Sequence, residues 1–254
     1  MADDVLVEQR ERILIITINR PAARNAINAA VTNGVAAALD QLDEREDLSI
    51  GVLTGAGGTF CAGMDLKAFL RGEQVVLPGR GLAGFTQAPP KKPLIAAVEG
   101  YALAGGCELV LACDLVVAAE NAKFGIPEVK RGLVAAGGGL LRLSRRIPPN
   151  LAMEYALTGD FFSAADAQRF GLANRVTPSG GALDGAVELA ARITANAPLS
   201  IAASKEVIIQ SSDWTAGDMW GNQDQIIRPI FTSADAREGA SAFAEKRAPV
   251  WRGE

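Results

Sequence analysis

Short apolar runs alternate with segments of helical spacing over the first 160 residues, and this alternation is the strongest constraint on the fold of the chain. The runs are rich in β-branched residues and each ends near Gly, Asn or a charge, which predicts strands. Strands separated by helices predict an α/β fold. We predict strands at 13–18, 50–54, 94–98 and 115–118, and helices at 30–42, 105–112 and 151–157.

The pattern changes twice further along the chain. Segment 71–93 carries four glycines and four prolines among few periodic apolar positions, so we interpret it as a loop-rich insert and a candidate wall of a substrate site. Beyond residue 182 the strand signals end, and helical patterns follow at 183–196, 199–210 and 226–243. We therefore expect a core over 1–182 and a carboxy-terminal helical region over 183–254.

Charge and cysteine content exclude several classes of partner. The net charge is −4 and no run of like charges is present, so we expect neither a nucleic acid nor a membrane partner. The amino terminus, Met1-Ala2-Asp3-Asp4, is acidic where a secretory signal is basic. The three cysteines form no C-x-x-C motif, which disfavours a disulfide framework and a zinc ribbon. We expect a cytoplasmic protein.

The chain contains no histidine, which limits the chemistry that it can perform. Histidine is the usual general base of serine and cysteine nucleophiles and the commonest ligand of catalytic zinc. Without it, Cys61, Cys107 and Cys113 are better interpreted as small buried side chains than as nucleophiles. We expect no metal site, and carboxylates as the proton carriers of any enzyme activity.

Two glutamates stand in glycine-bearing turns that follow predicted strands. Glu108 lies in the first turn of a helix that opens with Gly105 and Gly106, and Glu128 follows Pro127. Each glutamate alone could merely complement a helix dipole. The helix after Glu108 is apolar nearly all round, however, so this carboxylate is expected to be buried and to need a partner or a chemical role. A third turn, 54–66, is by itself typical of a tight connection between a strand and a helix.

The spelling and order of several motifs resemble one known family. These motifs are Phe60-Cys61-Ala62-Gly63-Met64-Asp65-Leu66-Lys67, Ala104-Gly105-Gly106-Cys107-Glu108-Leu109, Cys113-Asp114 and Phe124-Gly125-Ile126-Pro127-Glu128. Together they resemble the enoyl-CoA hydratase/isomerase, or crotonase, superfamily over nearly the whole chain. The resemblance implies a spiral of β-β-α turns with a carboxy-terminal helical region, and trimers that usually pair into hexamers.

The resemblance also implies an active site and a reaction. The backbone N–H groups of Ala62 and Gly105 would form an oxyanion hole for the thioester carbonyl, and Glu108 and Glu128 would be the catalytic acid/base pair. The reaction implied is reversible addition of water to a trans-2-enoyl-CoA, with coenzyme A as part of the substrate and no separate cofactor. The substrate and coenzyme A contacts implied are Arg24, Ala62, Gly63, Met64, Asp65, Leu66, Gly105, Phe243 and Lys246, of which Phe243 and Lys246 would reach a neighbouring subunit's nucleotide.

Two departures from the family pattern leave other activities open. Ala104 stands where many relatives have glycine, and 135–141 reads AAGGGLL where many hydratases have PGAGGTQ. The alternatives are an enoyl-CoA isomerase, a carnitinyl-CoA dehydratase-like enzyme and a non-catalytic acyl-CoA binder. Presence of both glutamates favours the hydratase, because a scaffold needs no costly buried carboxylates.

Overall fold

A six-stranded sheet forms the centre of the computed structural model, which describes residues 3–254 and so leaves Met1 and Ala2 outside the described residues. The strand order is β1-β2-β3-β6-β8-β11; β1 and β2 are antiparallel, and the remaining neighbours are parallel. The strands are β1 (Val5–Arg10), β2 (Ile13–Ile18), β3 (Ile50–Gly55), β6 (Leu94–Val98), β8 (Leu115–Ala119) and β11 (Arg175–Thr177). All four predicted strands are confirmed. Strands β1 and β11 were not predicted, because β1 is mostly exposed at the sheet edge and β11 has only three residues.

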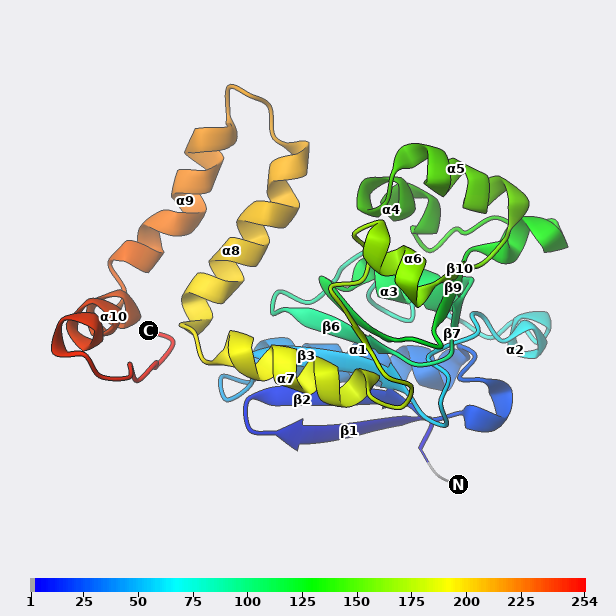
Figure 1. Cartoon of the computed structure of the whole chain (residues 1–254), viewed down its shortest axis with the longest axis horizontal. Coiled ribbons are helices and arrows are strands. Elements are labelled where there is room, and N and C mark those ends of the chain that lie inside the picture. The colour runs from blue at the N-terminus through cyan, green and yellow to red at the C-terminus, as the bar shows by residue number, and fades with distance from the viewer. Residues whose placement is uncertain (1–2) are drawn as a thin grey trace.

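The two faces of this sheet pack into two separate apolar cores. Side chains alternate across a strand, so in β2 Leu14 and Ile16 enter one core while Ile13 and Ile15 enter the other. Helix α1 (Ala29–Glu44) packs in the larger core, and α7 (Ala182–Thr194) covers the opposite face of the sheet (Figure 1). Buried alanines at every fourth position of α7, from 182 to 190, form the apolar stripe that contacts the sheet.

A second, three-stranded sheet brings the two glycine-bearing turns with glutamates together. It has the order β10-β9-β7, from β7 (Tyr101–Leu103), β9 (Lys123–Gly125) and β10 (Phe162–Ser163). Because β7 and β9 are parallel, with Leu103 opposite Gly125, the segments that follow them leave the sheet at the same edge. These segments are α3 (Gly105–Ala112) and the 3-10 helix η2 (Pro127–Arg131).

An insert between two strands and a group of three helices complete this part of the fold. The insert between β3 and β6 holds α2 (Leu66–Leu70) and a short antiparallel hairpin of β4 (Val76–Leu77) and β5 (Gly81–Leu82). Helices α4 (Gly139–Arg146), α5 (Pro149–Thr158) and α6 (Ala164–Arg169) form a layer beside α3 (Figure 1). The helices predicted at 30–42, 105–112 and 151–157 are confirmed as α1, α3 and α5.

The carboxy-terminal helices extend away from the sheet. Helices α8 (Pro198–Gln210) and α9 (Met219–Phe231) lie side by side, joined through the 3-10 helix η3 (Ser211–Asp213), and α10 (Ala234–Glu245) lies at the far end (Figure 1). The single helix predicted over 226–243 is wrong. Ser233 interrupts it, because its side chain accepts a hydrogen bond from the Ala236 N–H and caps a new helix.

The proposed division at residue 182 stays a prediction, and α7 belongs by its packing to the sheet. Lys205 fastens α8 to the core: its ammonium group donates to the carbonyls of Pro90 and Lys92 and to Asp114 at 2.7–2.9 Å. Across residues 3–254, no helix has both the length and the apolar character needed to span a bilayer.

Candidate active site

Glu108 is buried at the amino-terminal end of α3. Glu108 is only 3% exposed, and all eight residues of its helix are buried. The nearest partners come from a glycine turn at 137–139 that opens α4. The Gly139 N–H donates to Oε1 of Glu108 at 2.9 Å. The buried carboxylate of Glu108 therefore has a hydrogen-bond partner, as buried polar groups usually do.

Gly137 and Gly139 must be small for this contact to form. A Cβ atom on Gly137 would lie 2.7 Å from Oε2 of Glu108, and one on Gly139 would lie 3.0 Å from Oε1. Burial raises the pKa of Glu108, while the N–H groups of Gly139 and Gly137 and the charge of Arg142 act in the opposite direction. The turn thus holds one carboxylate by backbone donors.

Glu128 has a different environment. Pro127 begins η2 and restricts the backbone just before Glu128, and Oε2 of Glu128 is buried with no hydrogen-bond partner among residues 3–254. Burial raises the pKa of Glu128 to about 7; the negative charge of Glu108 adds to this, while its own backbone N–H and Arg131 oppose it. This carboxyl can hold a proton near neutral pH.

The structure contradicts the assignment of Ala62 to the oxyanion hole. The Ala62 N–H donates to the carbonyl of Arg24 at 3.0 Å, so it is already occupied. The Arg24 carbonyl is presented there by a left-handed backbone, with φ of 52°. Ala62 therefore serves the fold of the turn and offers no free donor.

Met64, two residues further on, has the free N–H that Ala62 lacks. Ile27 donates to the Gly63 carbonyl and accepts from the Asp65 N–H, so the Met64 N–H points away from this bridge. It donates to no acceptor among residues 3–254. The Met64 nitrogen lies 3.5 Å from the point where a Cβ on Gly105 would be. Gly105 begins α3, so its N–H has no partner inside the helix.

Close approach of two backbones brings these donors together. Gly63 has φ of +101°, and a Cβ there would lie 2.8 Å from Cβ of Ala104. Ala104 itself has φ of 51° and ψ of −127°, a conformation that side-chain-bearing residues rarely adopt. A glycine at this position would adopt the same conformation without strain.

Of the other predicted contact residues near this turn, Asp65 has structural partners, whereas Arg24 and Leu66 are exposed. Asp65 caps α2 by accepting from the N–H groups of Lys67 and Ala68, and its carboxylate lies 3.0 Å from Arg20. Arg24 and Leu66 are exposed at the rim. Asp65 therefore acts first as a helix cap, while Arg24 and Leu66 remain accessible for a ligand.

Phe243 and Lys246 lie far from Glu108 in the same chain. Phe243 is 88% exposed near the end of α10, and Lys246 follows that helix in a left-handed conformation. Helix α10 lies at the opposite end of the molecule from α2 (Figure 1). A single chain thus does not bring these two residues to the glutamate pair.

Two further side chains, Leu82 and Arg142, lie beside Glu108, and Leu82 belongs to segment 71–93, the predicted wall of a substrate site. Leu82 of β5 places Cδ2 2.9 Å from the Cβ position of Gly105 and 3.1 Å from that of Gly137. Arg142 of α4 donates to the carbonyl of Thr86 at 2.5 Å and is close enough to Glu108 to lower its pKa. Three consecutive glycines at the start of a helix were the available signal for the turn, and the glycine- and proline-rich segment 71–93 was the signal for Leu82, but nothing in the sequence marked Arg142.

The cysteines are buried and their burial opposes ionisation. Burial raises the pKa of Cys61 and of Cys107 to about 12. A thiol with such a pKa does not supply a thiolate near neutral pH. The described part of the chain, 3–254, holds no cluster of three or more residues of metal-binding type.

Comparison with known proteins identifies the family. The sequence model of the enoyl-CoA hydratase/isomerase family matches residues 8–254, and the chain belongs to this family, within the crotonase superfamily. It is 44% identical to the enoyl-CoA hydratase EchA19 of Mycobacterium tuberculosis, over 97% of this chain and 95% of that protein. It is 40% identical to a carnitinyl-CoA dehydratase of Salmonella typhi over the full length of both.

Solved structures support the same family assignment. The crystal structure of an enoyl-CoA hydratase from Mycobacterium tuberculosis H37Rv superposes with a TM-score of 0.98, at 62% identity and with all of both chains covered. The predicted α/β crotonase fold with a carboxy-terminal helical region is confirmed.

Proposed function

We propose that the protein is an enoyl-CoA hydratase, a hydro-lyase that adds water reversibly to a trans-2-enoyl-CoA to give a 3-hydroxyacyl-CoA. The observation that carries this proposal is the unequal environment of two glutamates, the buried Glu108 and the half-buried Glu128. Glu108 is held by the N–H of Gly139, whereas Glu128 has a pKa raised to about 7 and a buried oxygen that finds no partner in the described part of the chain, 3–254. Unequal carboxyls are suited to act as base and acid in one reaction.

The N–H groups of Met64 and Gly105 bind the thioester carbonyl oxygen in this proposal. Addition of water at C3 moves negative charge onto that oxygen, and two fixed donors stabilise it most when the charge is greatest. Met64 replaces Ala62 in this role because the N–H of Ala62 is bonded to Arg24.

Proton transfer then divides between the two glutamates. Glu108 takes a proton from the attacking water as its oxygen bonds to C3, and Glu128 gives a proton to C2. One proton has moved from Glu128 to Glu108, and exchange with solvent restores the starting state. Dehydration follows the same steps in reverse. Both protons are carried by carboxyl groups, so this scheme needs no metal or redox cofactor.

Assembly is part of the proposal, because Phe243 and Lys246 cannot reach the site of their own chain. We propose a homotrimer or a hexamer in which α10 contacts the coenzyme A nucleotide bound by a neighbouring subunit. The exposure of Phe243 supports this. Light scattering at micromolar concentration should return three or six chains, and a monomer would contradict a shared coenzyme A site.

The activity is tested by mixing the enzyme with trans-2-enoyl-CoAs of graded chain length. Loss of absorbance at the conjugated thioester band reports hydration, and its dependence on length reports the acyl group preferred. A preference for straight chains would place the enzyme in fatty-acid β-oxidation. The same assay with a carnitinyl thioester tests the dehydratase alternative. The similarity to the carnitinyl-CoA dehydratase of Salmonella typhi is the reason to test it. Product analysis for a shifted double bond tests the isomerase, and binding without turnover would favour an acyl-CoA binder.

A further inference from the structure

Arg142 contacts two segments that flank Glu108. One end of its guanidinium donates from Nη2 to the Thr86 carbonyl at 2.5 Å. The other end, Nη1, lies 2.1 Å from the point where a Cβ on Gly138 would be. The guanidinium therefore occupies the space that a side chain at this position would take. Gly138 also has φ of +104°, a conformation that favours glycine. Arg142 therefore packs directly on the turn that donates to Glu108.

Each of these contacts leads to the reacting groups through one further residue. Thr86 accepts from the Leu82 N–H at 2.9 Å through Oγ1 and donates its own N–H to the Leu82 carbonyl. Leu82 in turn lies against Gly105 and Gly137. On the other side, Gly138 precedes Gly139, whose N–H binds Glu108. Displacement of the guanidinium would therefore remove a contact from both the 81–87 loop and the 137–139 turn.

The charge of Arg142 also acts on Glu108. Within residues 3–254, the titratable groups that interact with this carboxylate are Glu128 from η2, Arg142 from α4 and Cys107 from its own helix. Arg142 is therefore the cation that opposes the effect of burial on Glu108.

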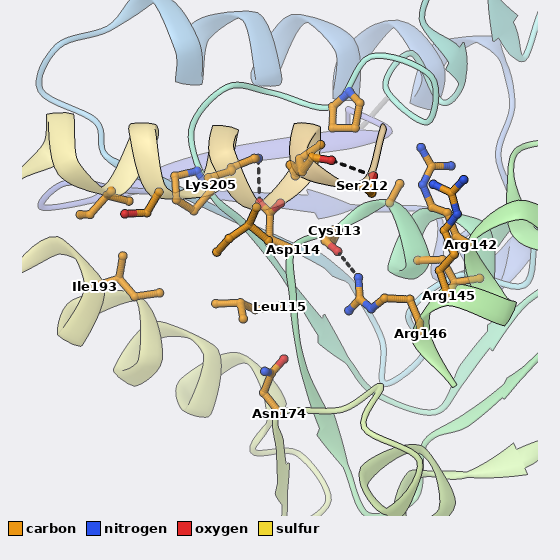
Figure 2. A pocket seen from close by; sticks show the side chains of 18 of the residues that line it. Cys113, Asp114, Leu115, Arg142, Arg145, Arg146, Asn174, Ile193, Lys205 and Ser212 are labelled. Carbon is orange, nitrogen blue, oxygen red and sulfur yellow. Dashed lines mark hydrogen bonds and ion pairs between the residues drawn. The ribbon is translucent and has the colours of Figure 1, made fainter. Parts of the chain in front are cut away.

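The guanidinium can be reached from outside the active site. Arg142 lines a cavity of about 1220 Å³ between α8 and the core, which opens beyond the carboxy-terminal end of α3. Figure 2 shows Arg142 and Arg145 together at one end of this cavity, with Lys205 and Asp114 on its other wall. A small cation could enter by this route without crossing the substrate site.

We propose that Arg142 is a positioning residue of the active site, which clamps the 137–139 turn and the 81–87 loop against Glu108. Loss of the guanidinium should misplace the base while leaving coenzyme A contacts in place. The catalytic part of this proposal rests on the hydratase function proposed above.

Three variants and one small molecule test the clamp. Arg142→Ala should lower kcat for crotonyl-CoA by at least about 10-fold with little change in KM, because small displacements of reacting groups are costly. Millimolar guanidinium chloride, entering through the cavity, should restore much of this loss. Arg142→Lys keeps the charge but cannot bridge two segments, so it should recover less kcat than guanidinium does. Arg145→Ala removes an exposed arginine of the same helix and cavity and should behave as wild type.

Two further readouts separate the clamp from a general loss of structure. The acid limb of the pH profile of kcat/KM should move to higher pH in Arg142→Ala and return in Arg142→Lys, because Glu108 ionises less readily without a nearby cation. Hydrogen exchange of a peptide covering 134–141 should be faster in Arg142→Ala, slower again with guanidinium, and unchanged in Arg145→Ala.

The outcomes decide the proposal in either case. Wild-type exchange in the turn of Arg142→Ala, or a kcat within about twofold of wild type, overturns it. If the Ala variant does not fold, Arg142→Gln is measured in the same way. If the wild type hydrates no enoyl-CoA, the proposed function fails, and the exchange measurement still decides whether Arg142 holds the turn.

Discussion

Gly139 donates its backbone N–H to Oε1 of Glu108 at 2.9 Å, and no equivalent donor among residues 3–254 serves the buried Oε2 of Glu128. The two carboxyls thus differ in how well a negative charge is stabilised. A carboxylate with backbone donors and a nearby cation is suited to be the base, and a carboxyl without them is suited to be the acid. This difference has consequences for both stability and catalysis.

The first prediction concerns the stability of the folded protein against pH. The pKa of Glu128 is about 7 in the fold and near 4.5 when unfolded, so the folded state binds more protons between these values. Stability should therefore fall as pH rises from about 4.5 to about 7, and the loss should be complete above that range. Glu128→Gln cannot ionise and should escape this loss. The difference in Tm between Glu128→Gln and wild type should grow over this range and then level off.

A matched control uses an exposed glutamate of the neighbouring helix. Glu154→Gln on α5 should show a Tm difference from wild type that does not change with pH. A Glu128→Gln difference as flat as that of the control would contradict the protonated state assigned to Glu128.

The second prediction tests the donor at Gly105. Proline is tolerated at the first position of a helix but lacks an N–H, so Gly105→Pro should remove one oxyanion donor. Loss of one such donor typically lowers kcat by about 10² to 10³. Gly105→Ala keeps the N–H and adds only a Cβ, which meets the flexible end of Leu82 at 2.9 Å. If both variants fold and Gly105→Pro turns over as fast as Gly105→Ala, Gly105 is not a donor.

The third prediction concerns backbone strain at Ala104. A residue held at φ of 51° and ψ of −127° carries strain of about 1–3 kcal/mol, and glycine removes it at an entropic cost of about 0.5–1 kcal/mol. Ala104→Gly should therefore stabilise the protein by about 1 kcal/mol in urea unfolding. Ala102→Gly, in the neighbouring strand β7, relieves no strain and should destabilise it. A destabilised Ala104→Gly would show that no strain is stored there.

The sequence predicted the fold and the glutamate pair because both depend on long patterns. The four strands of the central sheet came from β-branched runs, and Glu108 and Glu128 came from two motifs with a fixed order. The break at Ser233 was missed because apolar spacing continues across it, and only the cap hydrogen bond to Ala236 shows that one helix ends and another begins.

The error at Ala62 has a different physical origin. Every residue of the 60–65 motif has a backbone N–H, and the letters do not say which of them points at the substrate. The bridge to Ile27 decides this, because it leaves the Met64 N–H outside the hydrogen-bonded ladder while Ala62 donates to Arg24. Arg142 was missed for a similar reason, since its contact to Thr86 joins residues 56 positions apart.

The acid/base roles of the two glutamates are tested by the hydration of crotonyl-CoA by wild type, Glu108→Gln, Glu128→Gln and the double variant, with coenzyme A binding measured in parallel. Glutamine keeps the shape of each side chain but cannot exchange a proton, so each single variant should lose about 10² to 10⁴ in kcat while binding coenzyme A normally. Because the two groups act on one reaction, the double variant should lose much less than the product of the single losses. Near-normal turnover in either single variant would contradict the proposed mechanism.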